Sequence, residues 1–173
     1  IISGVYVGGV IGRILPYINR NYNEHIDANY SSGTVTGTEY AGGIIGYVEP
    51  TSSSNPYTYK TNINLNRFDG VITGASYAAG IFSYYKDNSK VTANHTIQSN
   101  IVTGIICGNG YVDGISQYSS YYNVCCAEEL SSTSYVPDRI GYYGTNYAYN
   151  GMVVKKNGVV QTVNDGDVNG TSY

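Results

Sequence analysis

The residue pattern with the most recognisable chemistry lies near the end of the 173-residue sequence. Asp165, Asp167 and Asn169 alternate before Gly170, which fits the first half of a calcium loop, D-x-[DN]-x-[DN]-G. Oxygen ligands at alternating positions around a glycine turn suit Ca²⁺. The sequence therefore predicts a candidate Ca²⁺ site here and no other cofactor, with a plain polar turn as the alternative.

Catalytic carboxylates are harder to assemble from this sequence. Glycosidases and lyases built on β-helices need two acidic groups, typically about 5–10 Å apart. When the internal repeats are aligned, Asp113 falls opposite Gly42 and Ala79, so no column of acidic residues is expected. We therefore expect a protein that is not an enzyme. A β-helix carbohydrate-active enzyme, a glycosidase or a lyase, is the alternative.

Histidine and cysteine give no further catalytic or metal pattern. Two isolated histidines do not define a catalytic triad, and we expect His95 to be a hydrogen-bonded core residue aligned with Ala28 and Leu65. No Cys-x-x-Cys spacing is present. The odd number of cysteines does not define a disulfide framework, so we interpret them as small buried residues. They are Cys107, Cys125 and Cys126.

Tyrosine is the most distinctive side chain available for binding, with 21 tyrosines and no tryptophan. A tyrosine ring offers an apolar face and a polar tip, which suits contact with sugars and with proteins. We predict ligand contacts from tyrosines in the variable loops, above all from residues 55–59 in the longest one, residues 49–61. The alternative is that these rings pack on the coils. The candidates are Tyr57, Tyr59, Tyr84 and Tyr85.

Composition limits both the fold and the partners. Glycine (22) and tyrosine (21) are abundant, charged residues make up only 12%, and good helix formers are scarce, which favours an all-β fold. The net charge of −3 and the sequence pI of about 5.2 disfavour a nucleic-acid binder. No apolar run approaches the ~20 residues of a membrane-spanning helix, so an integral membrane segment is not expected.

An internal repeat positions these residues. Similar motifs begin at tyrosines that are 34, 37, 34 and 24 residues apart: Tyr6, Tyr40, Tyr77, Tyr111 and Tyr135. Short units of this kind bury their apolar side only when they stack, so the repeat predicts a parallel β-solenoid, a right-handed β-helix, of about four to five coils over residues 1–141. The tyrosines should form one column, and Val35, Ile72 and Val102 an aliphatic one. A β-sandwich is the competing fold.

Residues 142–173 depart from the repeat. Two β-rich runs, 151–156 and 159–163, flank Asn157-Gly158, the dipeptide typical of a type I′ hairpin turn. We predict that this hairpin caps the C-terminal end of the solenoid, because an open sheet edge invites aggregation.

The repeat pattern G-[TV]-[VI]-T-G-x-x-Y-A-[GA]-G-I resembles the GLUG repeat, best in residues 33–46 and 70–81. The resemblance departs from the pattern at an apparent insertion, residues 105–108, and at Pro137 and Asp138. GLUG repeats occur in large bacterial surface or secreted proteins, some of them adhesin-like and some carrying IgA-specific metallopeptidase domains elsewhere. The resemblance implies an extracellular, non-enzymatic segment of a larger polypeptide. Its role would be adhesion to a host glycan or surface protein, or that of a rigid spacer.

Overall fold

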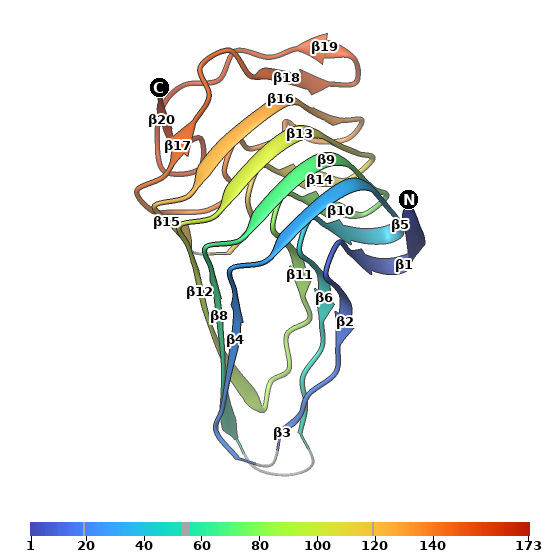
Figure 1. Cartoon of the computed structure of the whole chain (residues 1–173), viewed down its shortest axis with the longest axis vertical. Helices are drawn as coiled ribbons and strands as arrows, with labels where there is room; N and C mark the ends of the chain where they lie inside the picture. Colours follow the sequence, from blue (N-terminus) through green and yellow to red (C-terminus); the bar gives the residue numbers. More distant parts are fainter. Residues whose placement is uncertain (19, 53–55, 119) are drawn as a thin grey trace.

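The computed structural model describes residues 1–18, 20–52, 56–118 and 120–173, and it confirms the all-β, parallel β-solenoid fold. The chain makes about three full turns, fewer than the four to five expected, and then continues in shorter ones (Figure 1). Parallel strands pair between successive turns, so each face of the solenoid is a sheet.

Four sheets contain all the described strands. The largest consists of β1 (Ile2–Gly8), β5 (Tyr30–Gly42), β9 (Arg67–Gly74), β10 (Tyr77–Ala79), β13 (Ile101–Gly108), β14 (Tyr111–Asp113), β16 (Val124–Ser132), β17 (Tyr147–Ala148), β18 (Val153–Lys156), β19 (Val159–Val160) and β20 (Thr171–Ser172). The second consists of β2 (Ile11–Ile14), β6 (Ile45–Val48) and β11 (Phe82–Tyr85). The third consists of β4 (Tyr22–Asp27), β8 (Tyr57–Asn64), β12 (Val91–Gln98) and β15 (Ser120–Tyr121). The smallest pairs β3 (Tyr17–Ile18) with β7 (Thr51–Ser52).

The register of the fourth turn corrects the sequence alignment. Gly33, Gly70 and Gly104 occupy one column, with φ of 105°, 150° and 97°, a backbone conformation that favours glycine. Residues 105–108 are therefore not an insertion. Ile106, rather than Val102, continues the aliphatic column of Val35 and Ile72.

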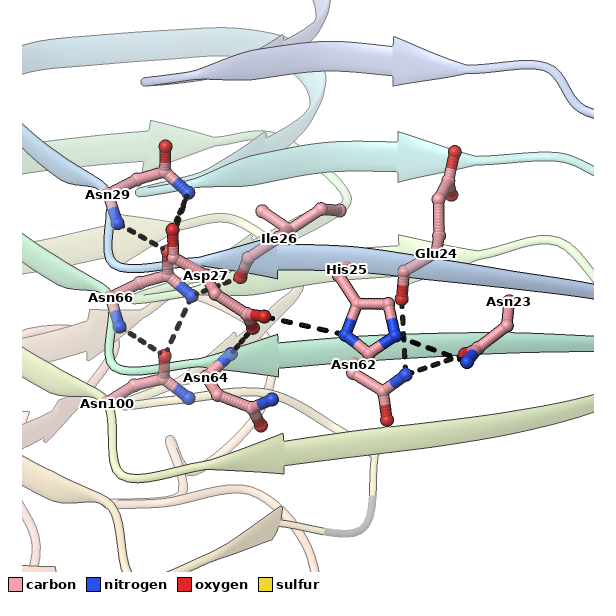
Figure 2. A network of polar contacts seen from close by, with 10 residues as sticks. All are labelled: Asn23, Glu24, His25, Ile26, Asp27, Asn29, Asn62, Asn64, Asn66 and Asn100. Carbon is pink, nitrogen blue, oxygen red and sulfur yellow. Dashed lines mark hydrogen bonds and ion pairs between the residues drawn. The ribbon is translucent and has the colours of Figure 1, made fainter.

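A buried asparagine ladder links the turns (Figure 2). The backbone N–H and Nδ2 of Asn66 both donate to Oδ1 of Asn100, at 2.9 and 3.0 Å, and Nδ2 also donates to the Ile26 carbonyl. The same bonds repeat from one asparagine to the next, so each amide satisfies the backbone of the neighbouring turn. The ladder consists of Asn29, Asn66, Asn100, Asn123 and Asn146.

The residue before each of the first four ladder asparagines turns the corner in the left-handed conformation, with φ between 55° and 58°; these residues are Ala28, Leu65, Ser99 and Tyr122. His95 therefore does not align with Ala28 and Leu65 as expected, but with Thr61 and Glu24.

The turns shorten abruptly after β12. The ladder asparagines are 37 and 34 residues apart in the first turns and 23 apart in the later ones. β12 pairs with β8 over all eight of its residues, but with β15 only at Ile97 and Gln98. The second, third and fourth sheets thus form a long lobe that the later turns do not extend (Figure 1).

The predicted hairpin is present at the C-terminal end. β18 and β19 pair antiparallel around Asn157 (φ 47°) and Gly158 (φ 76°), the two left-handed residues of the expected turn. β18 also pairs in parallel with β16 over Glu129–Ser132, so the hairpin lies on the end of the largest sheet. β17 and β20 continue the parallel ladder on either side of the hairpin in sequence. The parallel solenoid thus extends beyond residue 141.

Candidate functional site

Stacked tyrosine rings line one outer corner of the solenoid, and we call this set the tyrosine zipper. Its first column is the predicted one, with successive ring centroids 5.6, 5.6, 5.0 and 4.2 Å apart: Tyr6, Tyr40, Tyr77, Tyr111 and Tyr135. The offset stacking of these rings adds to the stability that ring burial provides. The sequence-based prediction of a tyrosine column is confirmed.

A second column, Tyr47 and Tyr84, interleaves with the first. The Tyr47 ring lies 4.3 Å from Tyr6 and 5.0 Å from Tyr40, and the Tyr84 ring lies 4.7 Å from Tyr40. We did not predict this column, although the signal was available: Tyr40 and Tyr77 are each followed by another tyrosine seven residues later. Between Tyr40 and Tyr47 the chain turns back at Gly43. A larger residue would not fit there, because its Cβ would lie 2.0 Å from the Gly80 carbonyl oxygen of the next turn.

One end of the zipper carries a small ionic cluster. The Arg13 guanidinium lies 4.9 Å from the Tyr6 ring centroid, and it donates to Glu49 at 2.7 Å. Lys86 donates to the other oxygen of Glu49 at 2.6 Å. The hydrogen bonds from Lys86 and Arg13 hold the pKa of Glu49 below its usual range.

The environment of the zipper raises the pKa values of its inner tyrosines. Burial, followed by the nearby Glu49 carboxylate, raises the pKa of Tyr47 to about 12. Burial and the neighbouring phenols also raise the pKa values of Tyr40 and Tyr77. These three residues therefore present neutral phenol groups, which can donate hydrogen bonds and make apolar contacts.

The four tyrosines predicted to contact a ligand lie in different environments. Tyr59 and Tyr85 are buried, at 0% and 3% exposure, so they are not surface contacts. Tyr59 points inward because it alternates with exposed residues along β8, and its hydroxyl bonds to Glu24. Tyr57 is half-buried at the start of β8, and Tyr84 belongs to the zipper.

Part of the predicted binding loop, residues 53–55, lies outside the described residues. Within the described part, Tyr57 and Tyr59 begin a regular strand, β8, and do not extend the loop. The prediction of a tyrosine-rich binding loop over residues 55–59 is therefore wrong for its second half.

One residue of the predicted calcium loop, Asp165, contacts a cation of the chain itself. Arg139 is 2% exposed, and its guanidinium donates to Oδ1 of Asp165 at 3.0 Å. The Ser172 backbone N–H donates to the same oxygen, also at 3.0 Å. Asp165 is therefore engaged by an internal arginine, and no group of three or more His, Cys, Asp and Glu side chains suited to a metal occurs among the described residues. Asp167 and Asn169 lie in the same turn, with Asp167 exposed.

A pair of stacked carboxylates contradicts the expectation of no acidic column. Asp113 pairs in register with Asp138 on the next turn, where neighbouring strands lie about 4.8 Å apart. Burial and then the Asp138 charge raise the pKa of Asp113 well above its ordinary value, and burial raises that of Asp138 to about 6. Counting from Tyr135 places Asp113 opposite Pro137; the structure shifts that register by one residue. Both carboxyl groups are therefore protonated at higher pH than an ordinary aspartate.

The cysteines are all free thiols, and Cys125 is fully buried as expected. Burial raises the pKa of the Cys125 thiol to about 12, which keeps it protonated and unreactive. Cys107 and Cys126 are half-buried on the outer face of the largest sheet.

Comparison of the chain with protein-family models, with curated proteins and with solved structures gave no match. Within the described ranges, there is no helix long and apolar enough to cross a membrane.

Proposed function

We propose that this chain is a rigid, non-enzymatic module of a bacterial cell-surface or secreted protein. The asparagine ladder carries the proposal, because its side chains bind each turn to the next from Asn29 to Asn146. The tyrosine zipper adds a second set of contacts between turns, at the corner where two sheets meet. The resemblance of the repeats to GLUG repeats supports the extracellular placement. Such a module would hold other parts of a longer polypeptide at a fixed distance.

Spin labels at the two ends test this rigidity. We would place labels at Ser3→Cys and Asn150→Cys, in a background with Cys107→Ser and Cys126→Ser, because both target residues are exposed. Pulsed electron paramagnetic resonance should give one narrow distance distribution. A control pair within one turn, Ser3→Cys and Asn23→Cys, sets the width that the label itself contributes. A distribution much broader than the control would overturn the proposal.

Adhesion is the second candidate function, and the zipper favours it. Tyr111 and Tyr135 are 45% and 46% exposed at one end of the first column, so their rings and hydroxyls are available to a host glycan or a surface protein. A glycan array, probed with and without Ca²⁺, should show binding that Tyr111→Ala removes. The matched control is Tyr121→Ala, because Tyr121 is 44% exposed and lies outside the zipper. Equal loss in both variants, or no binding, would count against adhesion through the zipper.

The carboxylate pair is the observation that favours the enzymatic alternative. A β-helix glycosidase or lyase would use Asp113 and Asp138 as its acid and base. Incubation with a panel of polysaccharides should release no reducing ends and no unsaturated products. Product formation that Asp138→Asn abolishes would replace the structural proposal with an enzymatic one.

A further inference from the structure

The shortening of the turns leaves a strand edge open on β12. β12 pairs with β8 over Val91–Gln98, but β15 covers only its last two residues on the other side. No other strand of the described residues pairs with 91–96 on that side. A strand in this position presents backbone N–H and C=O groups that an added strand can pair with.

The opposite edge of the same sheet is protected in a way that β12 is not. β4 carries Glu24, His25 and Asp27 along its six residues, and charged side chains on an edge strand discourage pairing with other chains. β12, Val-Thr-Ala-Asn-His-Thr-Ile-Gln, carries no acidic or basic side chain other than His95. Burial lowers the pKa of His95 to about 4, so its ring is neutral at pH 7.

A cavity of about 550 Å³ lies directly beside the open edge. Residues 93–96 line it from β12, and Gln117, Tyr118 and Tyr142 line it from the shortened turns. These groups are aromatic, amide, hydroxyl or small apolar ones with no formal charge, which suits apolar or uncharged side chains.

Buried polar atoms near this cavity lack partners within the described residues. Both ring nitrogens of His95 and the hydroxyl of Tyr85 are inaccessible and form no hydrogen bond. The His95 ring is enclosed by Phe82, Tyr85 and Tyr118, with centroids 5.4, 4.6 and 5.0 Å away. Unpartnered buried groups are costly to stability, and these lie next to the open edge.

We propose that the open edge of β12 binds an extended, uncharged peptide segment of a partner protein as an added β-strand. The added strand continues the ladder β4–β8–β12, with its backbone paired to residues 91–96. Its alternate side chains enter the cavity over Ala93 and His95, where small or branched apolar residues fit. The intervening side chains lie beside Asn94 and Thr96 on the outer face, where hydroxyl or amide residues fit. This site is separate from the tyrosine zipper and does not depend on the spacer function.

A blocked, fluorescein-labelled octapeptide that alternates valine with threonine is the probe. We expect it to bind the wild-type chain in a fluorescence anisotropy titration, and we expect the amides of 91–96 to gain protection from hydrogen exchange. The control peptide has the same side chains with every second amide N-methylated, which removes the donors on one edge. Failure of the first peptide to bind, or equal binding of both peptides, overturns the proposal.

Two matched variants locate the site. Asn94→Lys places a charge on the open edge and should weaken binding by about tenfold or more. Asn23→Lys adds the same charge at the register-equivalent position on β4 and should leave binding unchanged. Tyr142→Ala alters the cavity wall without touching β12 and should also weaken binding. Circular dichroism establishes that each variant is folded, and equal weakening by Asn94→Lys and Asn23→Lys contradicts the assignment.

Discussion

The first three turns, residues 1–98, and the later turns, residues 99–173, bury their ionisable groups differently. The long turns enclose an apolar interior that includes Phe82 and Ile63, and the His95 ring packs against Phe82. The short turns bury Asp113 and Arg139, which are 6% and 2% exposed. A shorter turn has a smaller interior and fewer apolar side chains to fill it. A larger share of its buried side chains is therefore polar.

This difference gives the two regions opposite responses to pH. His95 has a lowered pKa, so folding excludes a proton that the unfolded chain binds below about pH 6.5. Asp113 and Asp138 have raised pKa values, so the folded chain retains protons that the unfolded chain releases above about pH 4. Acid should therefore weaken the long turns and strengthen the short ones.

The largest effect should come from the element that joins the two regions. Asn100→Ala removes the acceptor for the Asn66 backbone N–H and the donor to the Ile63 carbonyl, both of them buried. We expect the free energy of unfolding to fall by about 3–5 kcal/mol, measured by urea titration. Asn29→Ala, at the half-buried end of the ladder, should cost less than about 1 kcal/mol. Equal losses in the two variants would show that the ladder does not stabilise the stack cooperatively.

His95→Leu should change the acid response of the long turns. Wild-type His95 must stay neutral in its aromatic surroundings, so its contribution is lost as the pH falls from about 6.5 through 4. We compare the free energy of unfolding of the variant with that of the wild type at each pH. This difference should be about 2–3 kcal/mol more favourable to the variant at pH 4 than at pH 7. Urea midpoints at the two pH values measure this. A gain that is independent of pH would instead indicate better apolar packing.

Asp113→Asn should change the response of the short turns with the opposite sign. The raised pKa of Asp113 means that ionisation above about pH 4 costs folding free energy, so the variant should be more stable than the wild type at pH 8. That advantage should disappear at pH 4, where the wild-type carboxyl is protonated. If Asp113→Asn destabilised the chain at pH 8, the carboxylate would have a favourable partner.

The sequence predicted those parts of the fold that depend on a motif visible within each repeat or on a local turn. Stacking aligns equivalent residues of successive turns, so the spacing of the tyrosines beginning at Tyr6 was enough to predict their column. Asn157-Gly158 was enough to predict the hairpin, because few dipeptides adopt two left-handed residues. The register of the fourth turn was wrong because matching Thr103-Gly104 with Thr73-Gly74 ignored which glycine has positive φ.

The sites were less predictable because they depend on single-residue offsets and on neighbours from other turns. Asp113 and Asp138 meet only after a one-residue shift that no local pattern reveals. Tyr59 was placed in a loop, but β8 already begins at Tyr57, and the alternation of that strand turns Tyr59 inward. Asp165 fits a calcium pattern, and only the fold brings Arg139 to it. The open edge of β12 arises because the described residues of the next turn include no strand that pairs with 91–96, and the sequence of a single repeat gives no sign of this.

The smallest effects should come from surface ion pairs, which also differ between the regions. In the short turns Glu129 bonds to Lys155 at 2.6 Å, and their side chains are 29% and 32% exposed. Glu129→Gln should cost less than about 1 kcal/mol, because a single exposed pair gains little over hydration. Glu49→Gln should cost more, since Glu49 holds both Arg13 and Lys86 beside the tyrosine zipper. Both losses should shrink in 0.5–1 M salt, where the Debye length falls to a few ångströms. A loss from Glu49→Gln that persists in salt would mean that the cluster acts through packing of Arg13 on the Tyr6 ring rather than through charge.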